Sequence, residues 1–487
     1  MRNCLVCPLV GIFALLALSG AARAQLVTPR TLPVFQDEQF DIYPTSRPGL
    51  AGVSIALDDT LADPFTNPAK ATRLRGVTII GAPYSHAVSD RKGGGRTLPI
   101  GLVASNGRWS GVALGAIQQL DRAGVAQFNA PSSKRTASNQ YITASLARRT
   151  TDGLSIGASG YRASLGAMDG VDLLYAGADR IEQEGSVTDV RIGAVQEWAP
   201  GHALELVVLH NSTNMTHDVH YTDFFFNQQT RVATTTSRSE VNPDRTQIWG
   251  VHTEYTQPVG SEGWRLGALA TANHLLHPKI PNYSLQNLPR DPGTTTAFNL
   301  GFGAAHIGGA TTFALDVIAE PMTSDTYAEA AAPVTAAGGA QIPVGGKTVE
   351  NAFIFSNSRI RVGVGHDFIT ESAKHGGLTL NLGLAVYSIS YRLTQRNNLL
   401  NTVRKQNEGW AEWTPQLGLR YRSRELELSY AYMRNCGNES CAPMGDRVTL
   451  QGAAVSSGGI IAAPSSPLFL RSGQETSHRL TIAIPVR

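Results

Sequence analysis

The sequence predicts an all-β protein: a transmembrane antiparallel up-and-down β-barrel of 14–16 strands, preceded by an N-terminal periplasmic hatch or plug segment. Three observations predict it. Segments of alternating apolar and polar residues recur along most of the chain, aromatic residues lie near their ends, and short connections alternate with long ones. Successive strand side chains point to opposite faces, so alternation gives one apolar and one polar face. An exported soluble β-domain is the alternative, but only the barrel explains why the connections sort by length.

The clearest strand covers residues 410–422. Leu417 and Leu419 share one face, whereas Arg420 and Arg422 share the other. We predict sixteen strands of this kind, with both ends of the barrel chain on the periplasmic side. They lie near residues 77–88, 97–104, 109–121, 140–150, 154–164, 187–198, 203–212, 246–257, 264–276, 296–307, 311–320, 350–367, 378–393, 410–422, 425–433 and 475–486.

Three positions depart from the regular pattern. Pro83 and Pro415 lie inside predicted strands and carry no N–H, so each predicts a local break in pairing. In the segment 378–393 the apolar face changes at Tyr387, which predicts a β-bulge or the membrane boundary.

The long connections are predicted on the external side of the membrane. They cover residues 122–139, 165–186, 213–245, 277–295, 321–349, 394–409 and 434–474. The loop 213–245 carries an aromatic run that could capture an apolar molecule or pack against the barrel rim: Tyr221, Phe224, Phe225 and Phe226.

The first 24 residues are predicted to be a secretory signal peptide. Arg2 precedes an apolar stretch, and Ala22-Arg23-Ala24 has the small-residue pattern of a cleavage site. Removing two arginines from 41 basic residues leaves 39 against 38 acidic ones, a net charge of +1. This balance gives no reason to expect a nucleic-acid partner. The expected location is the outer membrane of a Gram-negative-type cell.

Charged residues of both signs fall on the face that would line the lumen. Placing them in lipid would cost about 2–4 kcal/mol each near mid-bilayer, so the pattern predicts a polar interior holding water, a plug, or both. The main lumen candidates are Arg359, Arg361, Glu412, Arg420, Arg422 and Arg479, and the same face includes Asp189, Arg191, Glu197, Arg265, Glu425 and Glu427.

Residues 25–75 precede the barrel (76–487) and are predicted to form the hatch. Asn67 is a good N-cap, Pro68 suits a first helical position, and residues 69–74 can follow as a helical turn. Asp58 and Asp59 could pair with luminal arginines, namely Arg359, Arg361, Arg420 or Arg479, or form a solvated acidic turn.

An Ala-rich lead, an Asp pair and Asn67-Pro68-Ala69 just before the first strand resemble the hatch of the outer-membrane long-chain fatty-acid transporter (FadL-type) family. The resemblance implies a hatch that closes the periplasmic end and hydrophobic substrates that leave through the wall. The chain departs from that family at Lys70, where glycine is common, in exceeding its fourteen strands, and in ending without an aromatic residue.

The resemblance implies passive uptake of hydrophobic small molecules, fatty-acid or hydrocarbon-like, without any cofactor. The implied partners are outer-membrane lipid, the transported molecule and the barrel-assembly machinery. Two alternatives remain open: a general aqueous porin, favoured by the charged lumen, and a structural or secretion-accessory barrel.

Other chemistry is weakly indicated. Cys436 and Cys441 lie close together in a predicted external loop and are expected to form a disulfide. His217 and His220 have a spacing that converges on a helix but not on extended chain, so no metal site is expected. No nucleophile elbow or zinc-protease motif is present, and we expect no enzyme.

Overall fold

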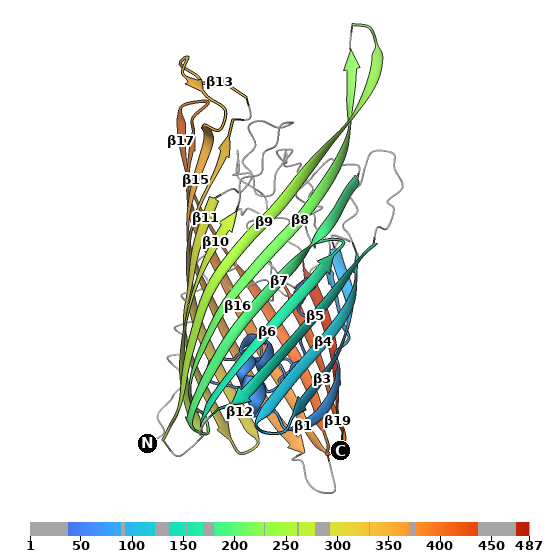
Figure 1. The fold of residues 1–487 in the computed structure, drawn as a ribbon, viewed down its shortest axis with the longest axis vertical. Helices are drawn as coiled ribbons and strands as arrows, with labels where there is room; N and C mark the ends of the chain where they lie inside the picture. The colour runs from blue at the N-terminus through green and yellow to red at the C-terminus, as the bar shows by residue number, and fades with distance from the viewer. Residues whose placement is uncertain are drawn as a thin grey trace, which may run out of the picture.

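The structure is a computed structural model that describes residues 38–88, 93–121, 136–150, 153–168, 180–227, 229–260, 263–277, 293–330, 332–369, 376–436 and 474–486. It is a closed antiparallel β-barrel of sixteen strands (Figure 1). The fold class, the strand number and the position of every predicted strand are therefore confirmed. The predicted signal peptide lies outside the described residues.

The barrel strands follow one another around the wall in chain order. They are β1 (Gly76–Gly81) with β2 (Tyr84–Val88), β3 (Gly93–Ser105), β4 (Trp109–Asp121), β5 (Thr136–Arg149), β6 (Leu154–Leu165), β7 (Arg180–Ala199), β8 (His202–Asn227), β9 (Val232–Val259), β10 (Trp264–His277), β11 (Gly293–Gly308), β12 (Thr311–Glu329), β15 (Lys347–Ile369), β16 (Gly377–Asn397), β17 (Thr402–Arg422), β18 (Glu427–Asn435) and β19 (Glu475–Val486).

β1 and β2 are two halves of one strand, which is why seventeen segments make sixteen strands. Both halves pair with β3 on one side and with β19 on the other, and this second pairing closes the barrel. Pro83 lies at the break, as predicted. Its carbonyl still accepts a hydrogen bond from Leu480 N, and the Ala82 N–H donates to Pro99 O, so the break is local.

Pro415 interrupts pairing on one side only. β17 pairs with β16 without a gap through Leu384 and Pro415, whereas its ladder with β18 stops at Gln416 and Met433. Of the two alternatives predicted for Tyr387, the bulge is wrong: the register of β16 with β17 is continuous from Gly377 to Asn397, and its register with β15 does not shift there, although that ladder skips two pairs between Phe355–Tyr391 and Ser358–Ser388. The apolar residues change face there because part of the lumen is itself apolar.

The outer surface is apolar strand after strand. On β3, Leu98, Ile100 and Leu102 are each about half exposed, and β8 repeats the pattern with Leu204 and Leu206. Side chains of this kind on the outside of a closed barrel face lipid. The chain is therefore an outer-membrane β-barrel. No helix in the described ranges has the length and apolar character needed to cross a membrane.

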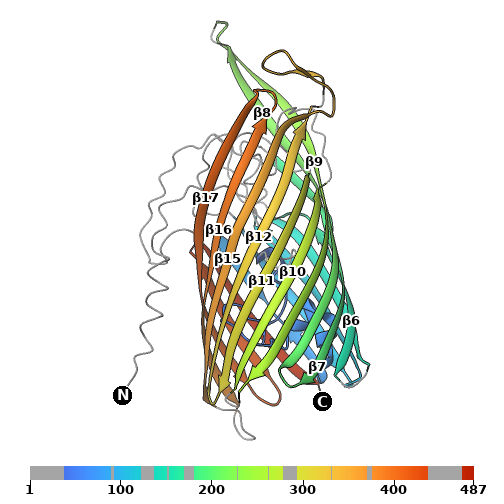
Figure 2. The ribbon, with the colours of Figure 1, turned by 90° about the vertical axis from the view of Figure 1, so that its left-hand side faces the viewer.

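Short connections gather at one end of the barrel and the longest strands rise from the other (Figures 1 and 2). The loop predicted over 213–245 is wrong, since β8 and β9 continue through it as one projecting hairpin. Above the bilayer the outer face need not be apolar, so the alternation that reveals strands is lost there. Strands also extend into the predicted loops 321–349 and 394–409, and the first contains a small hairpin of β13 (Val334–Thr335) and β14 (Gln341–Ile342).

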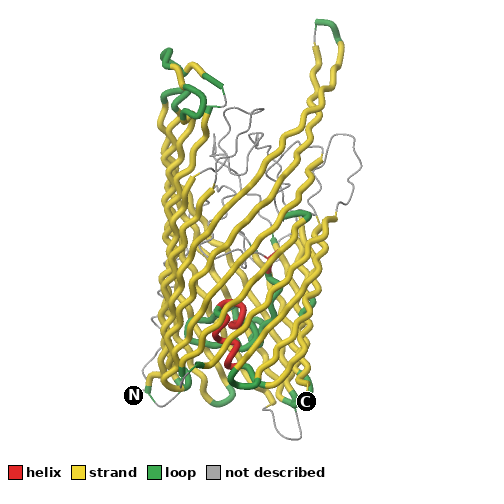
Figure 3. Tube along the Cα trace, in the orientation of Figure 1, coloured by secondary structure: helices red, strands yellow, loops and turns green. Residues whose placement is uncertain are grey.

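Within the described residues, three short helices precede the barrel strands: η2 (Glu38–Phe40), α2 (Asp63–Thr66) and η3 (Pro68–Arg73). α2 and η3 lie inside the barrel, in the half that carries the short connections (Figure 3). Asn67 caps η3 as its sequence context predicts, because its side chain accepts a hydrogen bond from Ala69 N.

Candidate functional site

The described part of the N-terminal segment, residues 38–74, crosses the lumen and is hydrogen-bonded to the inner wall. On one side of the barrel, four wall side chains donate to its backbone carbonyls, and one carboxylate accepts from a backbone N–H. The contacts are Arg479 to Tyr43 O (2.8 Å), Arg420 to Ser46 O (3.0 Å), Asn381 to Pro48 O (2.8 Å), Arg361 to Gly52 O (2.9 Å), and Ser54 N to Asp316 Oδ2 (2.8 Å). They come from β12, β15, β16, β17 and β19. Elsewhere on the wall, Gln118 of β4 donates to Gln39 O (2.8 Å) and Arg191 of β7 donates to Thr66 O (3.3 Å).

Glycines on the inner wall let the segment approach the strands closely. A Cβ added at Gly193 would lie 2.1 Å from Asn67 Oδ1, and one at Gly418 would lie 1.9 Å from Pro48 O. Both distances are far inside van der Waals contact, so only glycine fits. We call the eight wall glycines that meet the segment in this way the glycine belt: Gly157, Gly193, Gly267, Gly301, Gly303, Gly363, Gly383 and Gly418.

Lys70 anchors η3 in a buried ionic cluster on the opposite wall. Its Nζ lies 2.8 Å from Glu205 Oε1 and 3.6 Å from Asp63 Oδ2. Glu205 on β8 pairs in register with Glu254 on β9, and both side chains are buried. Asn67 Nδ2 also donates to Glu205 (3.1 Å). The lysine that departs from the family pattern is thus matched by wall carboxylates, and removing it would leave them uncompensated.

Asp58 and Asp59 do not use the arginines that the sequence predicted for them. Asp58 pairs with Arg73 (2.8 Å) of its own segment and with Arg265 (3.1 Å) of β10. Burial alone would raise its pKa, but Arg73, Lys70 and Arg265 together hold the pKa of Asp58 below its usual value. Asp59 instead accepts hydrogen bonds from Ser46 N and Oγ and so closes a turn within the segment. Three of the predicted partners, Arg361, Arg420 and Arg479, instead donate to backbone carbonyls of the segment, and the fourth, Arg359, lies beside Glu320.

Docking of the N-terminal segment is expected to weaken as the pH rises from about 4 to about 7. Burial, with Asp59, Asp58 and Glu205 nearby, raises the pKa of Asp63 from 3.8 to about 7, although Lys70 opposes the shift. The docked segment therefore holds a proton that a released segment would lose in this range, so raising the pH favours release. Brief openings of the protein in planar bilayers should become more frequent across this window, without a steady current, and Asp63→Asn should flatten the rise.

The control for this experiment is Asp121→Asn at the exposed end of β4, which should keep the wild-type pH profile. A wild-type profile that is flat between pH 4 and pH 7, or that falls, would contradict the assignment of this proton to Asp63.

Part of the lumen wall is apolar rather than polar. A buried cluster on β11, β12, β15 and β16 faces the interior, and we call it the apolar wall cluster: Ala297, Met322, Phe353, Phe355, Ile389, Tyr391 and Leu393, with Tyr387 packed against it. Phe353 and Phe355 stack at 5.7 Å between ring centroids, and Tyr391 tilts against both. The sequence indicated the change of face in β16, but it did not indicate that the inward-facing apolar residues form a cluster with those of β11, β12 and β15.

The remaining predicted lumen residues are placed as follows. Arg359 lies 3.7 Å from Glu320 and 4.6 Å from the Tyr387 ring centroid. Glu412 lies opposite Tyr387 in the register of β16 and β17. Arg422 is largely exposed at the end of β17, where it pairs with Glu427 (3.6 Å), so it belongs to the rim. Glu425 lies in the turn before β18, outside any strand.

The aromatic run predicted on an external loop lies on a strand instead. Tyr221 and residues 224–226 belong to β8 and pair with β9 up to Asn227 and Val232. Tyr221 faces inward and is buried. The run is thus part of the projecting hairpin, and its role in capturing a molecule stays a prediction.

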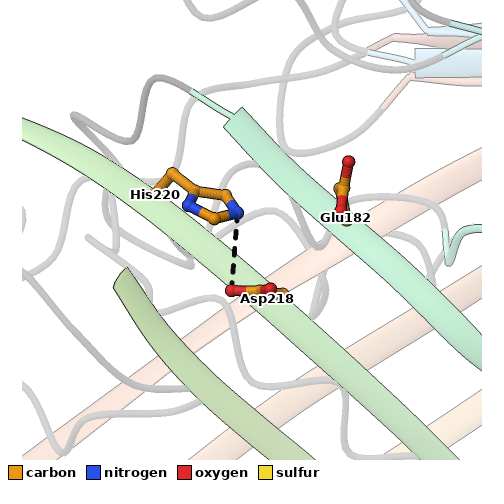
Figure 4. A group of neighbouring side chains, drawn as sticks. All are labelled: Glu182, Asp218 and His220. Carbon is orange, nitrogen blue, oxygen red and sulfur yellow. Dashed lines mark ion pairs between the residues drawn. The ribbon is translucent and has the colours of Figure 1, made fainter. Parts of the chain in front are cut away.

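One group of metal-type side chains lies on the outer face of the β7–β8 wall (Figure 4). Ligand atoms of Glu182, Asp218 and His220 all lie within 4.8 Å of one another, and His220 Nε2 is 3.5 Å from Asp218 Oδ1. His217 faces the opposite side of β8 and is buried. Arg180 already forms an ion pair with Glu182, so the carboxylate has a cationic partner without a metal.

Cys436 is disulfide-bonded, whereas Cys441 lies outside the described residues. The backbone N–H of Cys436 donates to Trp413 O (2.9 Å), directly beyond the point where the β17–β18 ladder ends.

Several solved structures are similar to this chain at low sequence identity. A FadL homologue from Pseudomonas aeruginosa shares 11% identity, with 91% of this chain and 99% of that one covered and a TM-score of 0.42. The Pseudomonas putida toluene transporter TodX shares 10%, with 91% and 99% covered and a TM-score of 0.40. CdiB from Acinetobacter baumannii shares 9%, with 92% and 66% covered and a TM-score of 0.37. No protein-family model and no curated protein sequence matches the chain.

Several residues of the site were missed by sequence reasoning, among them Glu205, Glu254, Asp316 and Glu320. A usable signal existed. Each is an isolated acidic residue between lipid-facing neighbours, as in Leu204-Glu205-Leu206 and Leu315-Asp316-Val317. An acidic residue at such a position faces the lumen by strand alternation and needs a partner there.

Proposed function

We propose that this chain is an outer-membrane channel for the passive uptake of hydrophobic small molecules. The observation that carries the proposal is the apolar wall cluster. Three aromatic rings and several aliphatic side chains, with Phe355 and Tyr391 almost fully buried, face the inside of a barrel rather than lipid. An aqueous pore gains nothing from such a surface, whereas apolar solutes bind to apolar, aromatic-lined sites.

The N-terminal segment supplies the second part of the proposal, a closed hatch. Its contacts with the wall run from Tyr43 to Arg73 and involve strands on several sides of the barrel. A solute would be captured outside, held at the apolar wall cluster, and released when the segment shifts. The driving force is the concentration gradient, and the shift needs only a minor conformer that the bound solute favours.

Cells that express the chain are expected to accumulate a radiolabelled apolar aromatic several-fold faster than cells that lack it. The purified protein should meanwhile give no large steady current in planar bilayers. Phe353→Ala with Phe355→Ala should slow the uptake because both rings are removed from the cluster, while the barrel keeps its heat-dependent gel shift. The exposed Leu400→Ala is the matched apolar truncation outside the cluster and should transport normally.

Two results would overturn the proposal. Large steady currents through the wild-type protein would identify an aqueous porin. Unchanged uptake, together with co-purification of the chain with a large envelope assembly, would identify a structural or secretion-accessory barrel.

A further inference from the structure

We infer that the barrel holds a binding site for an uncharged apolar molecule that carries a hydroxyl group. The apolar wall cluster would bind the body of the molecule, and a row of three buried polar side chains beside it would bind the hydroxyl: Asn299, Glu320 and Asn357. The inference rests on the proposed function and names the class of substrate.

The register places the polar row next to the cluster. Glu320 on β12 lies opposite Asn357 on β15, and the flanking pairs place Asn299 of β11 opposite Glu320. Two residues further along the same strands, Ala297, Met322 and Phe355 form the adjoining row of the cluster. Strands rise about 3.3 Å per residue, so the two rows are roughly 7 Å apart along the barrel wall. A single molecule of the size of a substituted benzene spans this distance.

The polar row contains buried atoms without hydrogen-bond partners. Glu320 and Asn299 are each 1% exposed, and Asn357 is 3% exposed. Within the described part of the chain, neither carboxylate oxygen of Glu320 accepts a hydrogen bond, nor does Asn299 Oδ1, and Asn357 Nδ2 donates none. Leaving such groups unpaired costs about 1–3 kcal/mol each, and native proteins rarely do so. Three acceptor atoms and one donor at one level select a molecule whose polar group can both donate and accept a hydrogen bond, as a hydroxyl does.

The charge at this level selects an uncharged donor. Arg359, one row further toward the N-terminal segment, lies 3.7 Å from Glu320 Oε1 and offsets its charge. A ligand carboxylate would be repelled by the negative charge of Glu320, and a pure hydrocarbon would leave the acceptor atoms without a hydrogen-bond donor. A hydroxyl group donates to Glu320 without changing the charge of the site, and charged acceptors give the stronger hydrogen bonds. The stacked Phe353 and Phe355 rings favour an aromatic body, so alkylphenols fit best.

The site also adjoins the docked segment. From the polar row toward the segment, the next pair on β12 and β15 is Ile318 with Arg359, and the pair after it is Asp316 with Arg361. Asp316 accepts a hydrogen bond from Ser54 N of the segment, and Arg361 donates one to Gly52 O. A molecule held at the polar row would therefore lie beside the wall residues that fasten the segment.

The test uses the full-length protein in lipid nanodiscs and three matched probes: 4-heptylphenol, 4-heptylbenzoate and heptylbenzene. Binding is measured by equilibrium dialysis, with empty nanodiscs subtracted. The phenol is expected to bind about tenfold or more tightly than either of the other two, which is the fold-change of one hydrogen bond to a charged acceptor.

Glu320→Gln should weaken binding of the phenol by about tenfold and strengthen binding of the benzoate, because Arg359 then lacks its carboxylate. Glu329→Gln makes the same change on the same strand outside the site and should alter neither. Equal affinities for the three probes, or a Glu320→Gln variant like the wild type, would overturn the inference while leaving hydrophobic uptake intact. If the wild-type protein binds none of the three, the proposed function fails as well.

Discussion

Gly193→Leu is expected to turn the closed barrel into a conducting one. A side chain at this position would start 2.1 Å from Asn67 Oδ1, so the cap of η3 and the wall cannot both keep their places. The sixteen-stranded wall is a continuous hydrogen-bonded cylinder, whereas the segment is a separate insert held to it by side-chain contacts, so the segment should give way. Overpacking typically costs about 1–3 kcal/mol, and an overlap with rigid backbone costs more. Planar-bilayer recordings should show steady currents that the wild type lacks.

The matched control is Gly160→Leu on the adjacent strand β6, because a Cβ at Gly160 meets nothing within 4 Å. It should remain closed. Gly418→Leu, where the Cβ would lie 1.9 Å from Pro48 O, should open the barrel from the other wall. If both belt variants stay closed while keeping the heat-dependent gel shift of a folded barrel, the segment is not what seals the lumen.

Lys70→Met is expected to release the segment without unfolding the barrel. The substitution removes the one ammonium between Asp63 and Glu205 and leaves their carboxylates buried. Breaking a buried pair from one side costs about 3–5 kcal/mol, or roughly 10²- to 10⁴-fold in the docking equilibrium. Trypsin cleavage at Arg73 of the folded barrel should accelerate accordingly, because cleavage follows the population of the released state.

Arg75→Met, at an exposed position just past η3, should leave the rate of cleavage at Arg73 unchanged. Adding Glu205→Gln to Lys70→Met should recover part of the protection, since one uncompensated charge is removed. Equal cleavage of wild type and Lys70→Met would mean that the glycine belt and the backbone contacts hold the segment alone.

The barrel strands could be predicted because the bilayer imposes a simple rule on each of them. Within the bilayer, every second residue of such a strand faces lipid and is apolar, as Leu98, Ile100 and Leu102 of β3 show, and this alternation needs no knowledge of the neighbouring strands. The same reasoning failed where the rule stops. The 213–245 hairpin lies above the membrane, so its outer face carries Thr, Ser and charged residues. The apolar alternation is absent there, and the sequence therefore predicts a loop where the structure has strands.

The candidate site was predictable in part. The N-cap Asn67, the lumen arginines Arg361, Arg420 and Arg479, and the break at Pro83 follow from local chemistry. The residues that pair with these side chains cannot be predicted from local chemistry. Arg265 rather than Arg420 meets Asp58, and Glu205 meets Lys70, because pairing across a barrel depends on strand tilt and register around the whole circumference.

The sequence alone determined that this chain forms a cylinder with an apolar skin, since strand alternation is a local property that lipid enforces one residue at a time. Only the tertiary structure decided what fills the cylinder. Phe355, Tyr391 and Glu320 lie on three different strands, and the sequence between them does not indicate that they are neighbours in the lumen. Antiparallel pairing of β12 with β15 and of β15 with β16 sets their register, and this register places an aromatic surface beside a buried carboxylate.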